Sequence, residues 1–467
     1  MAEVPQYYLA VIGSGPAGYV AAIRGGQLGL KTAIIEAEDY FGGTCLHWGC
    51  IPTKALLFNA EVYGYFQNAR EYGINCKQFA LDWDSIQNRK NKIVKKLAQG
   101  VEFLLKKNKV EMLQGRGRLA GGGRIVISTP KMREIEARRI ILAAGSEARN
   151  LTGLDPDAKT ILTNKEALAI KRAPESMVVM GAGAVGVEFA SIFQRLGARV
   201  TLLEMLPRVL PGEDEEVSTE IEKSLRKQGI AVHTQAKVES AARTGKFVRV
   251  VFSVKDGAVE RADAETLLVA IGRVPNTQDL GLEHTKIVTE RGFIKVNETM
   301  QTDEPGVYAI GDIVAGSPML AHVGEMEGIV AATHAAGKAA EPVNYRQVPN
   351  CIYCEPEVAS VGLTEKQARE AGHKVRLGKF PFSANSKAAI LGSREGFVKI
   401  VSEERYGEIL GVHMIGPRVT EMIAEAVVAM RLEATAEDLA HAIHPHPTLT
   451  ETILEAAHAA HDWPIHI

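Results

Sequence analysis

The fold is decided by the stretch from residue 8 to residue 36, which reads YLAVIGSGPAGYVAAIRGGQLGLKTAIIE. Residues 8–12 form a short apolar run typical of a strand, and residues 19–27 have the pattern of a helix. The turn Gly13-Ser14-Gly15-Pro16-Ala17-Gly18 joins them, and a second apolar strand at 32–35 ends on Glu36. This is the order of a dinucleotide-binding βαβ unit of about 30 residues.

The same order returns later in the chain. A strand at 177–180 leads into Gly181-Ala182-Gly183-Ala184-Val185-Gly186, a helix follows at 187–196, and a strand at 199–203 ends on Glu204. The acidic residue lies at the same distance from the first glycine in both copies, which unrelated loops would seldom produce. The sequence therefore predicts an internal repeat with two nucleotide sites.

Each residue type in these turns has a physical role. The first glycine makes the tight bend, the second lets the backbone approach a pyrophosphate, and the third lets helix and strand pack closely. The helix N-terminus then faces the phosphates. Glu36 and Glu204 are expected to accept ribose hydroxyls, and Glu204 would repel the 2′-phosphate of NADP; the alternative for both is a solvated strand end.

The composition excludes several classes of partner. The formal net charge is -2, with 24% charged residues of mixed sign, so no basic stripe for nucleic acid or anionic lipid is expected. No run reaches the roughly 18 apolar residues of a membrane span, and the N-terminus lacks the pattern of a secretory leader. We therefore expect a cytoplasmic protein that acts on small molecules.

Two of the five cysteines are close together, in Gly42-Gly43-Thr44-Cys45-Leu46-His47-Trp48-Gly49-Cys50. Their spacing is roughly one and a half helical turns, so Cys45 and Cys50 could form a disulfide if the turn distorts. Zinc is disfavoured because the pair lacks a second matching pair of ligands, and no metal site is expected. Cys351 and Cys354 are interpreted as ordinary buried cysteines.

The cysteine segment follows Glu36 closely, which favours FAD at the first glycine turn, since a redox pair would face the flavin. A thiol substrate also needs a base, because a free thiol of pKa about 8.5 is mostly protonated at neutral pH. His446, between two prolines, is the candidate base, and Glu451 is the candidate carboxylate that orients it. Thr448 with Glu451 also fits a capping box of the last helix.

Other strands end in glycine turns. Residues 139–144 end on Gly145, residues 267–271 end on Gly272, and residues 307–310 end on Gly311-Asp312. From about residue 345 the pattern changes to antiparallel strands at 397–401 and 409–415, followed by amphipathic helices. We therefore predict an α/β fold with two Rossmann-like dinucleotide-binding domains and a C-terminal α+β domain.

With these motifs, the sequence resembles the class I pyridine nucleotide-disulfide oxidoreductases over essentially its full length. The resemblance implies a homodimer with an FAD-binding domain at 1–149, an NAD-binding domain at 150–277, a central domain at 278–345 that completes the FAD site, and a dimerisation domain at 346–467. It implies FAD binding by Gly13, Gly15, Gly18, Glu36, Lys54, Gly145 and Asp312. It implies NAD binding by Gly181, Gly183, Gly186, Glu204 and Gly272.

The resemblance also implies the chemistry. Cys45 would exchange with substrate, Cys50 would face the flavin, and His446 with Glu451 would act from the other subunit. The segment His446-Pro447-Thr448-Leu449-Thr450-Glu451 looks like the form that oxidises dihydrolipoamide on lipoyl domains of a 2-oxo acid dehydrogenase or glycine cleavage complex. The alternatives are an NADH-dependent reductase of another small disulfide and a non-catalytic NAD-responsive scaffold.

Overall fold

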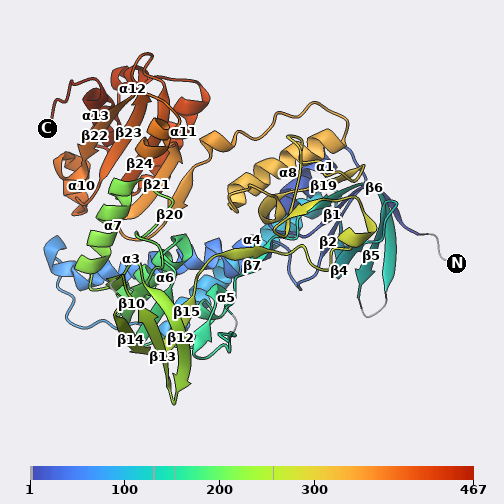
Figure 1. The fold of residues 1–467 in the computed structure, drawn as a ribbon, viewed down its shortest axis with the longest axis horizontal. Coiled ribbons are helices and arrows are strands. Elements are labelled where there is room, and N and C mark those ends of the chain that lie inside the picture. Colours follow the sequence, from blue (N-terminus) through green and yellow to red (C-terminus); the bar gives the residue numbers. More distant parts are fainter. Residues whose placement is uncertain (1–3, 130–131, 152, 256) are drawn as a thin grey trace. The chain divides into compact units, whose positions relative to one another are not determined.

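The structure is a computed structural model that describes residues 4–129, 132–151, 153–255 and 257–467. The chain divides into two compact units. The first comprises residues 1–55, 84–149 and 272–343, and the second comprises residues 56–83, 150–271 and 344–467. Each unit is continuous in space although its segments are far apart in sequence (Figure 1). No helix in the described part of the chain is long and apolar enough to cross a membrane.

The first unit is built on a mainly parallel sheet. Its strand order is β3-β2-β1-β6-β5-β4, with β19 pairing to β6. The strands are β1 (Gln6–Ile12), β2 (Thr32–Glu36), β3 (Glu111–Gln114), β4 (Arg116–Leu119), β5 (Arg124–Ser128), β6 (Arg133–Leu142) and β19 (Val307–Ala309). A turn at Gly121-Gly122-Gly123 joins β4 to β5, which pair antiparallel as a hairpin.

Both faces of β1 and its neighbours are buried. Leu9, Val11 and Ile34 face a core that helices cover, whereas Ala10 and Ile35 face a second core. This two-sided burial explains why the strands read as continuous apolar runs. The main helices are α1 (Pro16–Gln27), α2 (Gly43–Trp48), α4 (Trp83–Lys107) and α8 (Ala321–Ala335). Helix α3 (Cys50–Gln67) starts in this unit and continues in the second unit after residue 55.

The second unit begins with a parallel sheet that repeats the first. Its strand order is β11-β10-β9-β15-β8, and α6 (Ala184–Arg195) follows the second glycine turn. The strands are β8 (Ile161–Leu162), β9 (Ser176–Met180), β10 (Arg199–Leu203), β11 (Ala231–His233) and β15 (Thr266–Val269). Helix α7 (Glu215–Lys227) lies between β10 and β11 in the chain, and β12 (Lys237–Thr244), β13 (Phe247–Ser253) and β14 (Val259–Ala264) form an antiparallel sheet.

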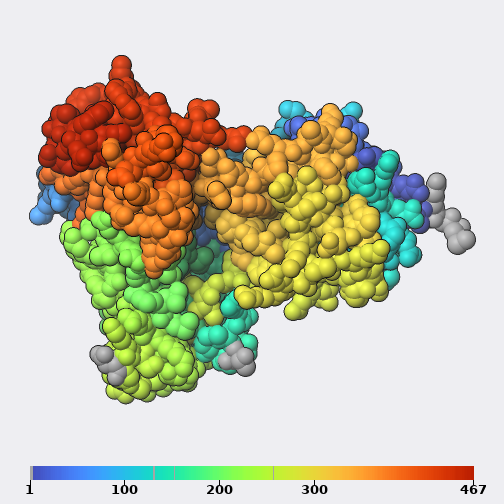
Figure 2. Space-filling view, turned by 45° about the horizontal axis from the view of Figure 1, so that its top comes forward, coloured from blue at the N-terminus to red at the C-terminus, as the bar shows by residue number. Residues whose placement is uncertain are grey.

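The C-terminal part of the second unit is an antiparallel sheet with helices on it. Its strand order is β20-β21-β24-β23-β22. The elements are β20 (Asn350–Ile352), β21 (Glu357–Gly362), α9 (Glu365–Glu370), β22 (Val375–Pro381), α10 (Ser386–Leu391), β23 (Phe397–Glu403), β24 (Ile409–Gly416), α11 (Val419–Arg431), α12 (Ala436–His441) and α13 (Glu451–Ala460). In Figure 2 its orange and red surface meets the green surface that contains α7. The predicted fold class is confirmed.

Candidate active site

The first glycine turn is closed by two contacts that leave no room for a side chain. Gly13 has φ +102°, and a Cβ there would collide with the carbonyl of Ala143. A Cβ on Gly18 would collide with the carbonyl of Gly13. At Gly15, by contrast, a Cβ would meet no atom of the described residues within 4 Å. The turn is therefore packed at its first and third glycines and open at its second, which fits a pyrophosphate at the start of α1.

The second glycine turn has the same geometry. Gly181 has φ +101°, and its Cβ would collide with the carbonyl of Ala270. A Cβ on Gly186 would collide with the carbonyl of Gly181, whereas one on Gly183 would face open space among the described atoms. The repeat predicted from sequence is thus also a repeat of backbone contacts, and both turns fit a dinucleotide.

The two acidic residues lie beside their glycine turns. Glu36 is 7% exposed; one oxygen accepts from the backbone N–H and hydroxyl of Ser14, and the other accepts from the N–H of Glu38 at 2.9 Å. Glu204 is 8% exposed and accepts from the N–H groups of Ala182 at 2.7 Å and Leu206 at 2.8 Å. Neither acid is a solvated strand end, so that alternative is wrong.

The cysteine segment packs directly on the first glycine turn. A Cβ on Gly43 would lie 2.5 Å from the Cα of Gly15, and the N–H of Gly42 donates to the carbonyl and hydroxyl of Ser14 at 3.1 and 3.0 Å. Two adjacent glycines thus let the chain turn onto the βαβ unit. This contact places the cysteines beside the first nucleotide turn, as the sequence indicated.

A helix break between the cysteines brings them together. Helix α2 ends before Gly49 and α3 begins at Cys50. A Cβ on Gly49 would lie 2.8 Å from the carbonyl of Thr44, so the close approach at the break requires glycine. Thr53 then donates its hydroxyl to the carbonyl of Gly49 at 2.6 Å, which secures the first turn of α3. The distortion that the spacing required is this break.

Cys45 and Cys50 are both partly buried, and no disulfide joins them in this structure. A hydrogen bond with Cys50, burial and the charge of Cys50 raise the pKa of the Cys45 thiol well above its usual value. Lys54, on the first turn of α3, acts in the opposite direction and lowers the pKa of Cys45. Lys54 is thus the cation that favours a thiolate at Cys45, against the effects of burial and the neighbouring sulfur.

Asp312 lies in a polar cluster with two residues that the sequence reasoning missed. It follows Gly311 in a short 3-10 helix and accepts the hydroxyl proton of Ser146. The Nε of Arg273 donates to the same hydroxyl at 2.6 Å and lies 3.9 Å from Asp312. Burial lowers the pKa of Arg273, whereas Asp312 and Cys50 raise it. The guanidinium is thus electrostatically linked to the redox pair.

Gly145 and Gly272 stand directly before Ser146 and Arg273. They precede β7 (Ser146–Ala148) and β16 (Arg273–Pro275), which pair antiparallel, and the carbonyl of Gly145 accepts from the N–H of Asn276 at 2.9 Å. The signal for Ser146 and Arg273 was therefore in the sequence, because each follows a glycine turn at the end of a buried strand.

In the second unit, His446 and Glu451 form the expected pair. The Nδ1 of His446 lies 2.9 Å from Oε1 of Glu451, and Oε2 accepts from the N–H of Thr448 at 2.8 Å. Burial raises the pKa of Glu451, but the hydrogen bonds from Thr448 and His446 lower it by more, so the pKa lies below its usual value. The imidazole, 71% exposed, is held by an ionised carboxylate and presents its other nitrogen outward.

The capping box expected at Thr448 is wrong. Helix α13 begins at Glu451 after Thr450, and no described side chain caps it. The hydroxyl of Thr448 donates to the carbonyl of Pro445 at 2.8 Å instead. The reason is that the helix begins later, with Thr450 as its N-cap, and the Glu451 carboxylate holds both the N–H of Thr448 and the imidazole of His446.

Two further histidines near His446 are held by protein contacts. His444 lies 2.8 Å from Glu425, and His441 lies 2.9 Å from the carbonyl of Glu437. Within the described ranges, no three His, Cys, Asp or Glu side chains are grouped to hold a metal ion. Cys354 is buried, as expected, but Cys351 is only partly buried because it lies on the edge strand β20.

Comparison with known sequences identifies both parts of the chain. Residues 7–328 match the Pyridine nucleotide-disulphide oxidoreductase family, and residues 348–457 match the dimerisation domain of that family. The dimerisation domain supports a homodimer.

Individual proteins are similar over nearly their full length. The Dihydrolipoyl dehydrogenase of Bacillus subtilis is 46% identical over 99% of both chains, and that of Rhizobium etli is 43% identical over 98% of both. Among solved structures, LpdA from Mycobacterium tuberculosis has a TM-score of 0.89 at 28% identity, covering 97% of this chain and 99% of its own. The HOCl-induced flavoprotein disulfide reductase RclA from Escherichia coli has a TM-score of 0.85 at 26% identity, covering 96% and 98%.

Proposed function

This chain belongs to the pyridine nucleotide-disulphide oxidoreductase family, and on that premise we propose that it is an FAD-dependent dihydrolipoyl dehydrogenase that oxidises protein-bound dihydrolipoamide with NAD⁺. The observation that carries the proposal is the packing of the cysteine segment on the first glycine turn, through Gly43 and Gly15. A thiol pair beside a dinucleotide turn, in a chain so similar to dihydrolipoyl dehydrogenases, is suited to pass electrons from a dithiol to a flavin.

The first step is a thiol–disulfide exchange at Cys45. A deprotonated substrate thiol attacks the Cys45 sulfur of the oxidised pair, the Cys45–Cys50 bond breaks, and Cys50 leaves as a thiolate. The second substrate thiol then attacks its own sulfur in the mixed disulfide, and Cys45 is released. The substrate becomes a disulfide and the cysteine pair is reduced; one of the two substrate thiol protons stays with the reduced pair and the other is released.

His446 serves as the base for the substrate thiol. Its Nδ1 is held by Glu451, so Nε2 can accept the thiol proton, and the carboxylate stabilises the resulting imidazolium. In the homodimer, the His446 that serves one cysteine pair comes from the partner subunit, as the family resemblance implies. The pair would then be inactive in an isolated chain.

FAD, when bound, accepts the two electrons of the cysteine pair and delivers a hydride to NAD⁺. The residues proposed to hold it are Gly13, Gly15, Gly18, Glu36, Lys54, Gly145 and Asp312. Ser146 and Arg273 belong with Asp312, because the three share a hydrogen-bonded cluster. The residues proposed for NAD are Gly181, Gly183, Gly186, Glu204 and Gly272, and the buried Glu204 carboxylate disfavours the 2′-phosphate of NADP.

The biological setting follows from this activity. Lipoyl domains of a 2-oxo acid dehydrogenase or glycine cleavage complex would deliver the dithiol, and a reducing cytoplasm suits a catalytic cysteine pair. The domain boundaries expected at 149/150, 277/278 and 345/346 remain part of the proposal. The alternative function is an NADH-dependent reductase of another small disulfide, and the observation that supports it is the similarity to RclA.

A visible spectrum of the purified full chain tests the proposal. Dihydrolipoamide should bleach the flavin band and produce a long-wavelength thiolate-to-flavin band, and NAD⁺ should then yield NADH while NADP⁺ should not. Bound flavin that dihydrolipoamide does not reduce, together with NADH oxidation by another disulfide, would establish the alternative function. Flavin that exchanges electrons with neither would favour the scaffold, and absence of flavin would overturn the assignment of the first glycine turn.

The base is tested separately. His446→Gln should lower dithiol oxidation by about 10²–10⁴-fold, the usual range for loss of a general base. His441→Gln is the matched control, because His441 is exposed and contacts the α12 carbonyl of Glu437 and the ring of Trp463, not Glu451. Equal rates in the two variants would remove His446 from the mechanism.

A further inference from the structure

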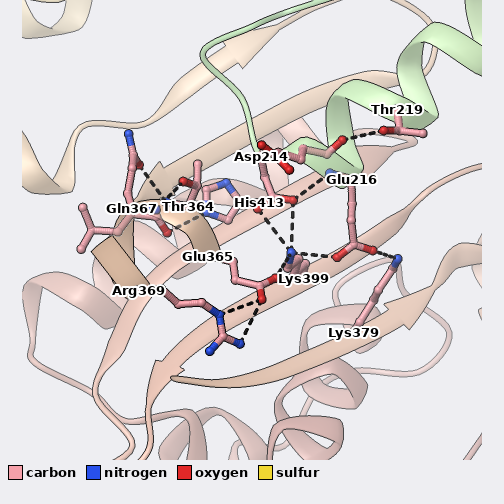
Figure 3. A network of polar contacts seen from close by, with 12 residues as sticks. Asp214, Glu216, Thr219, Thr364, Glu365, Gln367, Arg369, Lys379, Lys399 and His413 are labelled. Carbon is pink, nitrogen blue, oxygen red and sulfur yellow. Dashed lines mark hydrogen bonds and ion pairs between the residues drawn. The ribbon is translucent and has the colours of Figure 1, made fainter. Parts of the chain in front are cut away.

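A buried lysine joins the two parts of the second unit. Lys399 on β23 has a side chain that is only 3% exposed, and its Nζ lies 3.2 Å from Asp214, 2.8 Å from Glu216 and 2.9 Å from Glu365. Figure 3 shows these carboxylates converging on the ammonium from two directions, Asp214 and Glu216 from α7 and its cap, and Glu365 from α9. We call these residues the Lys399 cluster.

Neighbouring cations balance the three carboxylates of the Lys399 cluster. Glu216 also pairs with Lys379, and Glu365 pairs with Arg369 at 3.0 Å. Burial lowers the pKa of Lys399, but the hydrogen bonds to Glu216 and Glu365 and the charge of Asp214 raise it well above its usual value. A buried ion that loses its partner strongly destabilises the fold. Removal of the lysine would therefore leave the buried Asp214 carboxylate, whose side chain is also 3% exposed, without its counter-ion.

The cluster fixes the beginning of α7. Asp214 is the N-cap of this helix, and its Oδ1 accepts from the N–H of Glu216 at 3.1 Å while it binds Lys399. The preceding residue, Glu213, is 6% exposed and accepts from the side chain of Asn350 on β20 at 2.6 Å. Two consecutive acidic residues are thus held by β20 and β23 of the dimerisation segment, which comprises residues 348–457.

The segment that ends at Asp214 begins at Glu204, the acid of the second glycine turn. Along it, the N–H of Leu210 donates to the carbonyl of Ala182 at 2.9 Å, between the first two glycines of the turn. The hydroxyl of Ser218 on α7 donates to the carbonyl of Leu210 at 3.0 Å. Residues 204–214 therefore connect the glycine turn to the Lys399 cluster by a short hydrogen-bonded path.

From this path we propose that Lys399 is a positioning residue for the NAD site, which acts from the dimerisation segment through Asp214 to hold residues 204–214 against the second glycine turn. The inference rests on the proposed function only in taking that turn as the NAD site. Lys399 touches neither cofactor nor substrate, so its effect should appear in NAD affinity and not in the cysteine chemistry.

The test is calorimetric binding of NAD⁺ to the oxidised, FAD-loaded Lys399→Met enzyme, with stopped-flow reduction of its flavin by a dithiol as the second readout. We expect the Kd for NAD⁺ to rise about two- to thirty-fold, the range of coupling from remote positions. The rate of flavin reduction by the dithiol should stay within about twofold of the unaltered chain. An unchanged Kd, or equal losses in both readouts, would overturn the proposal.

A milder variant keeps the test decisive if Lys399→Met does not fold. Glu216→Gln alters the half-exposed member of the cluster and should raise the Kd for NAD⁺ by about twofold to fivefold, a smaller effect in the same direction. Arg249→Gln is the matched control, because it breaks an exposed ion pair with Asp263 in the sheet β12–β14. Equal Kd values for Glu216→Gln and Arg249→Gln would overturn the proposal.

These measurements separate the inference from the function on which it rests. NAD⁺ binding needs no dithiol substrate, and dithiothreitol can reduce the cysteine pair. If the unaltered chain binds NAD⁺ but does not oxidise dihydrolipoamide, the proposed substrate is wrong and the ratio of Kd values still decides the role of Lys399. If the unaltered chain binds no NAD⁺, the site assignment and the inference fall together.

Discussion

The two glycine turns of this chain have the same backbone geometry and different surroundings. In both, the first glycine has φ close to +100° and the third packs against the carbonyl of the first, while the second faces open space within the described structure. After Glu36, however, the chain turns back and packs Gly43 on Gly15. After Glu204, it instead binds Ala182 through Leu210 and continues to the Lys399 cluster.

If the two turns hold FAD and NAD as proposed, this difference separates the site that exchanges electrons with the cysteine pair from the site that binds NAD. The glycine geometry is what a pyrophosphate requires, so both copies keep it. The segment after the acid decides what else reaches the cofactor: a thiol pair in the first copy and a packed loop in the second. Substitutions at equivalent positions of the two turns should therefore affect different steps.

The largest effect should come from the element found in only one copy. Cys50→Ser removes the leaving thiolate of the exchange, so dihydrolipoamide oxidation should be lost essentially completely while flavin and NAD⁺ still bind. Steady-state assays with spectra of the bound flavin measure this. Cys76→Ser, at a cysteine outside both glycine turns, is the matched control and should retain full activity. Turnover in Cys50→Ser would exclude the disulfide mechanism.

The open glycines give the sharpest comparison. Gly15 and Gly183 have φ of -59° and -74°, which any residue adopts, and a Cβ on either meets no described atom within 4 Å. Alanine at either position should preserve the fold and weaken only the binding of the cofactor, by about 1–3 kcal/mol, as overpacking does. Gly15→Ala should reduce FAD retention and Gly183→Ala should raise the Kd for NAD⁺, measured by flavin release and calorimetry.

Two contrasting results would break this comparison. If Gly15→Ala weakened the binding of NAD⁺ and left the binding of FAD unaffected, the assignment of the two cofactors to the two turns would have to be reversed. Gly18→Ala and Gly186→Ala should instead damage the fold itself, because their methyl groups would collide with backbone carbonyls. Thermal unfolding of these two variants distinguishes a packing role from a ligand-facing one.

A smaller effect is expected at the acids. Glu204→Gln removes the negative charge next to the ribose, so the preference for NAD⁺ over NADP⁺ in kcat/KM should fall by about tenfold, since hydrogen bonds to charged groups contribute about 1.5–3 kcal/mol. Glu36→Gln is the matched variant and should leave this preference unchanged. A preference that persists in Glu204→Gln would show that other residues reject the 2′-phosphate.

The smallest effect is expected at the position where the turns differ by one hydroxyl. Ser14, which is fully buried, bridges Glu36 and the N–H of Gly42, whereas the second turn has Ala182 at this place. Ser14→Ala should reduce the free energy of unfolding by about 1 kcal/mol, because the carbonyl of residue 14 still binds Gly42. Chemical denaturation measures this, and a loss of several kcal/mol would show that the hydroxyl holds the cysteine segment.

Much of this organisation could be predicted from sequence because it depends on local pattern. Glycine spacing, apolar runs and the following acid define a βαβ unit within about 30 residues, so both turns and the fold class could be identified. The residues of the base also lie close together in sequence, from His446 to Glu451. Contacts of this range need no knowledge of how distant segments pack.

What the tertiary structure alone decided depends on segments that meet only after folding. Ser146, Arg273 and Asp312 come from three parts of the sequence. Ser146 and Arg273 begin the paired strands β7 and β16, and Asp312 lies in the short 3-10 helix after β19, so the three side chains meet only in the folded chain. Lys399 reads as a strand residue in an apolar run, and only packing shows that it is buried among Asp214, Glu216 and Glu365. A buried charge needs counter-charges close to it in space. Here they come from residues far apart in the chain, so their spacing in the sequence does not predict the pairing.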